Sequence, residues 1–266
     1  MSRLVSLDQI TQLRELERAR AKRDGIGYEE EFQAFLGRLK SGGVGTPDPA
    51  RARKRSRGTK FPPRDPRIIQ QAKRLWDKGW GDASWWVDPR GDTRGAKSFS
   101  EYLDSIPDIP QFPAAWDARF PHLVLVDRRA IIVETCWMLN VDFNGDSETL
   151  VPYDPATAPT SSVYWMRAQH GKSNWCREPN DCRTEFASRG DELGLDALEG
   201  LALYAQFPDL LKIDTAMDLP SSVRAGDRDC FAYLGRWANG GVGLSWYLGS
   251  RANSGFGSAS RGAHVS

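Results

Sequence analysis

One histidine and two cysteines, His170, Cys176 and Cys182, follow one another at intervals of six residues. Imidazole nitrogens and thiolate sulfurs are ligands that Zn²⁺ prefers, and a cysteine with a histidine can also form a nucleophile and its base. Zinc sites usually hold their ligands in pairs two to four residues apart, and the chain has no CxxC motif. A fourth ligand would have to come from Cys230 or His264. We therefore expect ordinary thiols and no bound metal or other cofactor.

The most distinctive chemical feature is a basic run in the first quarter of the chain. Six of the ten residues from Arg51 to Lys60 are Lys or Arg, and none is acidic. Closely spaced cations can displace counterions from nucleic acid, and nearby tryptophans can stack on bases. An acidic protein partner would attract the same charges, and a solvated linker is the third interpretation. The residues predicted for such a binding surface are Arg51, Arg53, Lys54, Arg55, Arg57, Lys60, Trp80, Trp85 and Trp86.

A second group of residues could hold an anion. The stretch SGFGSASRG combines glycines with Ser258, Ser260 and Arg261, and backbone N–H groups of such a turn can cradle an anion. Its glycine spacing matches neither the P-loop nor the dinucleotide fingerprint. The competing prediction is a flexible, turn-rich segment that starts at Gly249. No metalloprotease, nucleophile-elbow or kinase signature occurs, so no catalytic residue is assigned.

The elements that position these residues fall into three regions. Apolar residues at helical spacing predict a helical hairpin in residues 1–40. Glycine, proline and like charges predict a basic, flexible linker in residues 41–66. Asp65 is predicted to cap a third helix, which Gly79 ends. Residues 67–266 are predicted to form one domain.

The core of this domain, at about residues 98–266, mixes strand and helix patterns. HLVLV (122–126) predicts a buried strand, and Asn239-Gly240-Gly241 predicts the turn of a hairpin between residues 230–237 and 242–248. Asp127 is predicted to cap a helix over residues 130–139. The predicted fold class is α+β, with a small and mainly antiparallel sheet. Further helices are predicted at residues 180–188 and 195–207.

The charge distribution is uneven. Residues 1–97 hold 22 Lys or Arg against 13 Asp or Glu, whereas residues 98–266 hold 14 against 22. A basic arm beside an acidic body either binds a polyanion or is neutralised within the fold or across a homo-oligomer. The four cysteines are too few for a disulfide scaffold. No apolar stretch suggests a signal peptide or a membrane span, so we expect a cytoplasmic protein without a membrane partner.

Five stretches between about residues 120 and 263 stand out by their order and spacing. They are TLVPYDPATAP (149–159), VYWMRAQHGKSN (163–174), LDALEGLALYAQFPDLL (195–211), CFAYLGRW (230–237) and GSASRGA (257–263). In these stretches the chain resembles an uncharacterised family of bacterial domains found mainly in actinobacteria and related soil bacteria. The resemblance implies a bacterial cytosolic protein, and it supplies no mechanism because the family has no established activity.

Three functional hypotheses follow from these patterns. The first is a non-catalytic interaction or accessory protein that binds a macromolecular partner, most simply another protein, in the bacterial cytoplasm. The second is a nucleic-acid-binding protein that uses the basic run and the neighbouring tryptophans. The third is a small-molecule enzyme with a site at the C-terminal Gly/Ser/Arg stretch.

Overall fold

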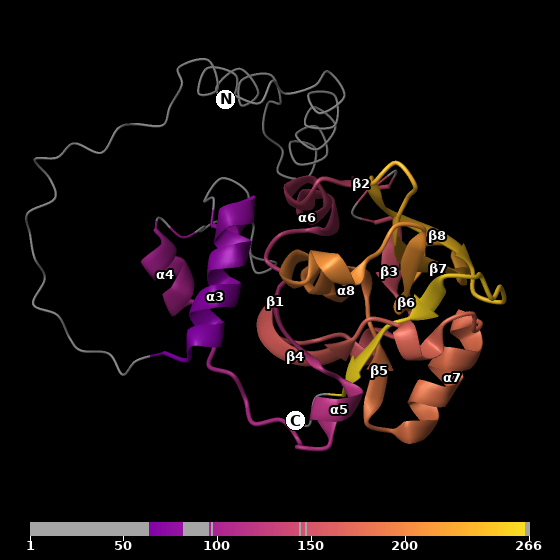
Figure 1. Cartoon of the computed structure of the whole chain (residues 1–266), viewed down its shortest axis with the longest axis horizontal. Coiled ribbons are helices and arrows are strands. Elements are labelled where there is room, and N and C mark those ends of the chain that lie inside the picture. Colours follow the sequence, from indigo (N-terminus) through magenta and orange to yellow (C-terminus); the bar gives the residue numbers. More distant parts are fainter. Residues whose placement is uncertain (1–63, 82–95, 97, 144, 147, 264–266) are drawn as a thin grey trace, which may run out of the picture. The chain divides into compact units, whose positions relative to one another are not determined.

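The computed structural model describes residues 64–81, 96, 98–143, 145–146 and 148–263. The hairpin predicted for residues 1–40 lies outside the described residues, as does the linker up to residue 63. The chain divides into two units, Met1–Phe61 and Pro62–Ser266, and the described residues belong to the second unit. Helices and two β-sheets make up this unit, so the predicted α+β class is confirmed (Figure 1).

The first described helix, α3 (Pro66–Leu75), begins where the sequence predicts it. The Asp65 carboxylate accepts a hydrogen bond of 2.8 Å from the backbone N–H of Arg67, and Pro66 occupies the first turn. The chain continues as a π-helical turn, η1 (Trp76–Trp80). Within it Gly79 has a φ of 113°, a left-handed conformation that ends the regular helix and that glycine adopts readily.

The first sheet is antiparallel throughout. Its order is β1-β4-β10-β5, so the late strand β10 stands between two earlier ones. Strand β1 extends the predicted HLVLV strand by one residue, and its residues after the first two are almost fully buried. The strands are β1 (His122–Asp127), β4 (Val163–Gln169), β10 (Ser260–Gly262) and β5 (Glu192–Gly194).

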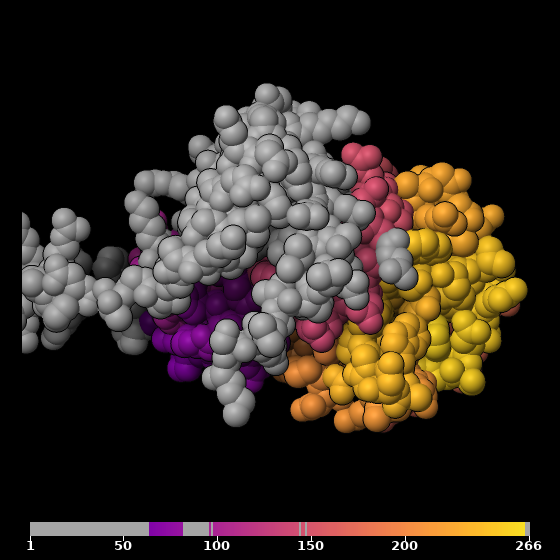
Figure 2. Space-filling model, turned by 90° about the horizontal axis from the view of Figure 1, so that it is seen from above, coloured from indigo at the N-terminus to yellow at the C-terminus, as the bar shows by residue number. Residues whose placement is uncertain are grey.

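The second sheet is mixed but mainly antiparallel, as the sequence predicts, and it is a separate sheet from the first. Its order is β2-β8-β7-β6-β3, and β9 also pairs with β6. The β7–β8 hairpin is confirmed, whereas the β2–β8 and β6–β9 pairs are parallel. In the view from above, the pink residues around β2 border the orange and yellow residues of the later strands (Figure 2). The strands are β2 (Val141–Phe143), β3 (Leu150–Pro152), β6 (Thr215–Arg224), β7 (Asp227–Arg236), β8 (Val242–Leu248) and β9 (Phe256–Ser258).

Helix α8 (Ala197–Gln206) lies between the sheets and packs on β1, β6 and β7 (Figure 1). It is apolar on almost every side, as a helix buried all round must be. Gly200 allows its close approach to β6, because a Cβ there would lie 2.4 Å from Leu219. The remaining helical elements are α4 (Phe99–Asp104), α5 (Trp116–Arg119), α6 (Ile132–Leu139), η2 (Pro155–Thr157), η3 (Lys172–Asn174), α7 (Pro179–Arg189) and η4 (Pro208–Leu210).

The predicted cap of the helix at residues 130–139 is wrong. Helix α6 starts two residues later, and the Glu134 carboxylate accepts the backbone N–H of Ile131 at 3.1 Å. Asp127 is instead 4% exposed and binds the guanidinium of Arg129 and the hydroxyl of Tyr102. Its carboxylate therefore joins β1 to α4 rather than starting α6.

The segment after Gly249 is also different from the flexible tail that its composition predicts. It forms β9 in the second sheet and β10 in the first, joined by the fully buried Ala259. The N–H of Ala259 donates to the carbonyl of Asp218, and its carbonyl accepts the N–H of Leu195, each at 3.0 Å. Gly257 is required here because a Cβ would lie 2.2 Å from the carbonyl oxygen of Gly171. Small residues thus let this strand pass through the centre of the domain.

Candidate functional site: a crevice between the two sheets

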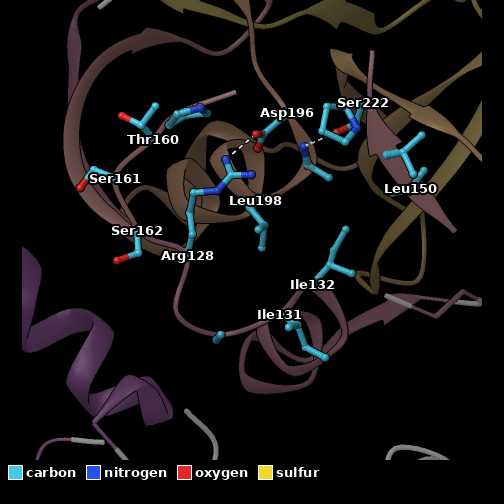
Figure 3. A pocket seen from close by; sticks show the side chains of 15 residues that line it. Arg128, Ile131, Ile132, Leu150, Thr160, Ser161, Ser162, Asp196, Leu198 and Ser222 are labelled. Carbon is cyan, nitrogen blue, oxygen red and sulfur yellow. Dashed lines mark hydrogen bonds and ion pairs between the residues drawn. The ribbon is translucent and has the colours of Figure 1, made fainter. Parts of the chain in front are cut away.

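A crevice of about 630 Å³ opens to solvent where the two sheets diverge (Figure 3). Its walls come from the end of β1, the start of α6, strand β3, the loop before β4, the N-terminus of α8 and the last residues of β6. This volume falls in the range of pockets that hold a small molecule or a few side chains. Its apolar wall is formed by Ile131, Ile132, Leu150, Pro152, Pro159 and Leu198.

The opposite side of the crevice is polar. Arg128 forms an ion pair with Asp196, and its backbone N–H donates to the carbonyl of Ser162 at 2.7 Å. Figure 3 shows the hydroxyls of Thr160, Ser161 and Ser162 along this side, with Arg128 and Asp196 beside them. Burial lowers the pKa of Arg128, but Asp196, together with Tyr164 and Glu199, outweighs that effect, so the pKa stays above its ordinary value. The guanidinium is therefore a permanent cation whose charge a neighbour already balances.

The N-terminus of α8 supplies its own acceptors to this wall. The Asp196 carboxylate accepts the N–H of Glu199 at 2.8 Å, and the Glu199 carboxylate accepts the N–H of Asp196 at 3.0 Å. The hydroxyl of Ser222 on β6 accepts the N–H of Ala197 at 2.9 Å. Two carboxylates thus occupy the positive end of the helix dipole, so a free anion gains little there.

A buried ionic network lies behind the crevice. The Glu199 side chain is 1% exposed, and its Oε1 lies 2.6 Å from Nε of Arg261 and 2.7 Å from the hydroxyl of Tyr164. Burial raises the pKa of Glu199, and Arg261 opposes that rise. The network therefore runs from Arg128 through Asp196 and Glu199 to Arg261, with two positive and two negative groups. The charges at the floor of the crevice therefore nearly cancel, and their side chains are held in place by ion pairs and hydrogen bonds.

The structure separates the three residues predicted as an anion cradle. Ser258 belongs to the second sheet, whereas Ser260 and Arg261 belong to the first, and all three are at most 3% exposed. Arg261 faces the Glu199 carboxylate instead of an external anion. These residues therefore do not form an anion site that is open to solvent. Arg261 instead pairs with Glu199 behind the crevice wall.

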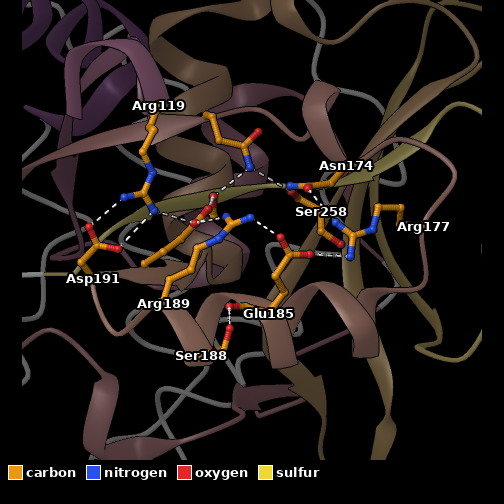
Figure 4. Close-up of polar contacts among 11 residues, drawn as sticks. Arg119, Asn174, Arg177, Glu185, Ser188, Arg189, Asp191 and Ser258 are labelled. Atoms are coloured by element: carbon orange, nitrogen blue, oxygen red, sulfur yellow. Dashed lines mark hydrogen bonds and ion pairs between the residues drawn. The ribbon is translucent and has the colours of Figure 1, made fainter. Parts of the chain in front are cut away.

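The surroundings of Ser258 and Ser260 form a second polar network (Figure 4). The amide of Gln169 donates to the carbonyl of Ser258 at 3.0 Å and to the hydroxyl of Ser260 at 2.8 Å, and Ser260 donates to Glu192. The buried Glu192 carboxylate also forms ion pairs with Arg119 of α5 and Arg189 of α7. These contacts fasten the C-terminal strands to the helices around them.

Trp80 cannot serve in nucleic-acid contact as predicted. Its side chain is 1% exposed, and the indole Nε1 donates to the backbone carbonyl of Asp127 at 3.2 Å. A ring enclosed in this way cannot stack on a base. The other eight residues predicted for that surface, from Arg51 to Lys60 and Trp85 with Trp86, lie outside the described residues.

The three weak metal candidates are not gathered into one place. His170 lies 5.5 Å from His122 between ring centres, Cys176 is exposed and Cys182 is fully buried. Burial lowers the pKa of His122 to about 4, lowers that of His170 and raises that of Cys182. Among the described residues, no group of three or more His, Cys, Asp or Glu side chains could hold a metal ion.

The sequence interpretation missed the residues of the crevice. Arg128 and Asp196 are 68 positions apart, and no local pattern links them. One signal was present: Asp196 and Glu199 have the spacing of a capping box, which marks the start of α8 and hence one wall of the crevice. The Thr-Ser-Ser run at residues 160–162 has no such signature.

Comparisons with known proteins add no further information on this site. No protein-family model, no curated protein and no solved structure matches the chain. The resemblance at residues 120–263 therefore contributes neither a fold nor an activity. Within the described part of the chain, none of the helices is both long enough and apolar enough to cross a lipid bilayer.

Proposed function

We propose that this chain is a non-catalytic interaction protein of the bacterial cytoplasm, and that its crevice receives a short segment of a partner protein. The observation that carries the proposal is the open cavity of about 630 Å³ with one apolar and one hydroxyl-bearing wall. Among the described residues, its lining contains no His, Cys, Lys, Glu or Tyr side chain. Asp196, the one acid among the described lining residues, is already bound to Arg128 and to the N–H of Glu199. Such a lining suits recognition better than acid–base chemistry.

The shape of the crevice favours a compact turn over an added strand. Strand β3 is an edge strand of its sheet, but Pro152 has no N–H with which to hydrogen-bond an added strand. A small molecule in an open crevice would keep much of its surface in water, whereas a side chain carried by a partner gains contacts around the rim. We therefore expect an apolar side chain against Leu150 and Leu198, with its flanking amides near the hydroxyls of residues 160–162.

A direct test uses N-acetyl-leucine methylamide, which presents one apolar side chain between two amides. The probe is titrated into the full-length chain, and backbone amide shifts are followed by NMR. We expect saturable shifts at residues 160–162 and 197–198. Leu198→Trp, which fills the apolar wall, is expected to weaken binding at least tenfold, while the same change at Leu248, a 40% exposed residue outside the lining, leaves it unchanged.

Two outcomes would contradict the proposal. One is the absence of saturable shifts at these amides, and the other is equal binding by wild type and Leu198→Trp. N-acetyl-lysine methylamide serves as a polar comparison probe. If it bound as well as the leucine compound, the apolar wall would not be the recognition element.

The nucleic-acid hypothesis stays a prediction on narrower grounds. It loses Trp80, which is buried, and depends on the basic run at residues 51–60. Replacement of Arg53, Lys54, Arg55 and Arg57 by Ser tests it. Retention on heparin and DNA should then fall, and the salt dependence of binding should become shallower.

A further inference from the structure

Two histidines lie side by side at the end of β1 that is away from the crevice. His122 is the first residue of β1, and His170 directly follows β4, the strand paired with it. Their ring centres are 5.5 Å apart, and both side chains are half-buried. The ring of Phe207, just after α8, lies 5.2 Å from that of His122. The crevice begins at Arg128, beyond the other end of β1, so the histidine pair is a separate feature.

The separation of the two rings is close to the one that a shared metal ion requires. A Zn²⁺ ion lies about 2.0–2.1 Å from an imidazole nitrogen, and hence about 3.2 Å from the ring centre. Two rings at the tetrahedral angle around one ion therefore have centres about 5.2 Å apart. The observed 5.5 Å corresponds to a slightly wider angle. Because two rings in edge-to-face contact show a similar separation, the ring nitrogens supply the deciding observation.

The nitrogens of both rings are available for a ligand. Within the described part of the chain, no hydrogen bond or ion pair engages a ring nitrogen of His122 or His170, and none of these nitrogens is enclosed away from solvent. Burial lowers the pKa of His122 to about 4 and also lowers that of His170, so both imidazoles are neutral at pH 7. The neutral imidazole is the form that binds metal ions.

The charges around the pair indicate which ions it suits. Lys172 acts on His170, and no carboxylate among the described residues acts on either ring. Mg²⁺ and Ca²⁺ prefer oxygen ligands, whereas imidazole suits Zn²⁺, Cu²⁺ and Ni²⁺. The Lys172 ammonium repels a bound cation, and two protein ligands are fewer than the four of a structural zinc site. Binding should therefore be reversible and weaker than in such a site.

We propose that His122 and His170 together chelate one late first-row divalent ion, such as Zn²⁺ or Cu²⁺, with water at its remaining positions. The ion joins the start of β1 to the segment that follows β4. Since no group of three or more ligand side chains exists among the described residues, the two imidazoles are the whole protein contribution that these residues supply. The site is independent of what the crevice binds.

A titration of the full-length chain with ZnCl₂ tests the site, with the imidazole nitrogens observed by long-range ¹H–¹⁵N NMR. We expect saturable shifts at the ring nitrogens of both His122 and His170, with one ion per chain. The signals of His264, the third histidine of the sequence, should stay in place. Cu²⁺ should compete with Zn²⁺ at lower concentration, and Mg²⁺ should leave the spectrum unchanged.

Three variants separate the histidine pair from other ligands. His170→Asn removes one imidazole and should lower the affinity for Zn²⁺ at least tenfold. Lys172→Gln removes the nearby ammonium from an exposed position and should raise the affinity about two- to fivefold. Cys176→Ser is the control, because this exposed thiol is the other accessible zinc ligand close by in the sequence, and its loss should leave the affinity unchanged. Lys172→Gln and the wild-type shifts decide the matter if His170→Asn does not fold.

Three results would overturn the proposed site. The first is the absence of saturable shifts at the two rings, or a shift at one ring alone, which would exclude chelation. The second is equal affinity of wild type and His170→Asn for Zn²⁺. The third is loss of binding in Cys176→Ser, which would place the ion on the thiol.

Discussion

Glu199 in α8 and Asp218 in β6 are both carboxylic acids removed from solvent, at 1% and 0% exposure, but their surroundings differ. Glu199 has the Arg261 guanidinium and the Tyr164 hydroxyl at its carboxylate. Among the described residues, Asp218 has the Tyr247 hydroxyl and no cation. Burial raises the pKa of both groups. From this comparison we expect Glu199 with its cation mainly to stabilise the fold, and Asp218, with no cation among the described residues, to make the stability depend more strongly on pH.

The largest loss of stability is expected when the ion pair between Arg261 and Glu199 is broken. Arg261→Met leaves Glu199 buried without its cation, which should lower the free energy of unfolding by about 3–5 kcal/mol. Urea denaturation at pH 7 measures it. The double variant Arg261→Met, Glu199→Gln should recover much of the loss, because it removes the unpaired charge. A loss below about 1 kcal/mol in the single variant would mean that the pair does not fix the fold.

The buried carboxyl of Asp218 should make the free energy of unfolding depend on pH. In the unfolded chain Asp218 loses its proton near the ordinary pKa of 3.8, whereas the native chain keeps it until about 7. The wild type should therefore lose stability as the pH rises from about 4 to 7, by an amount on the order of 4 kcal/mol, and no more above that range. Asp218→Asn should lack this loss. The difference between the two denaturation series isolates it, with the exposed Asp229→Asn as the control.

Removal of the single hydrogen bond from Tyr164 to Glu199 should lower stability by a smaller amount. Tyr164→Phe deletes the hydroxyl that lies 2.7 Å from the Glu199 carboxylate but leaves Arg261 in place. A hydrogen bond to a charged group contributes about 1.5–3 kcal/mol, so the free energy of unfolding should fall by about 2 kcal/mol. Thermal and urea denaturation should agree. An effect as large as that of Arg261→Met would show that the hydroxyl, not the cation, holds Glu199.

The smallest effect is expected at the solvent-facing end of the second polar network. Arg119 binds Asp191 and Glu192, but its side chain is 37% exposed and water can replace it. Arg119→Gln should therefore lower stability by less than about 1 kcal/mol, and added salt should reduce the difference further. Denaturation in low and high salt checks both points. A loss that salt does not change would place Arg119 with the buried pairs.

Local patterns predicted a good part of the fold. The Asp65 cap, strand β1, the β7–β8 hairpin and helix α8 occur within a few residues of their predicted places. Each is encoded by neighbouring residues, through a capping side chain, an apolar run or a glycine turn. No strand was predicted at β6, where the buried Asp218 and a proline interrupt the apolar pattern.

The crevice and the strands behind it could not be predicted from such local patterns. Strands β9 and β10 consist largely of Gly and Ser, which favour turns when only local preferences decide. Their extended form comes from distant partners, and Gly257 is needed because another backbone passes close to it. The pair Arg128–Asp196 likewise forms only after the end of β1 and the start of α8, 68 positions apart, have come together. Prediction therefore stopped where long-range contacts overrode local preference.

The central place of β10 has a consequence for how the domain is made. Because β10 stands between β4 and β5, and Ser260 contacts Gln169 across 91 positions, the first sheet cannot close on a ribosome-bound chain until residues 256–262 have emerged. Until then α8 carries Glu199 without its cation. Pairings this distant in sequence form slowly and leave apolar surface exposed in the meantime. We expect the nascent domain to stay sensitive to proteases, and to engage chaperones, until residues 256–262 have paired in the two sheets.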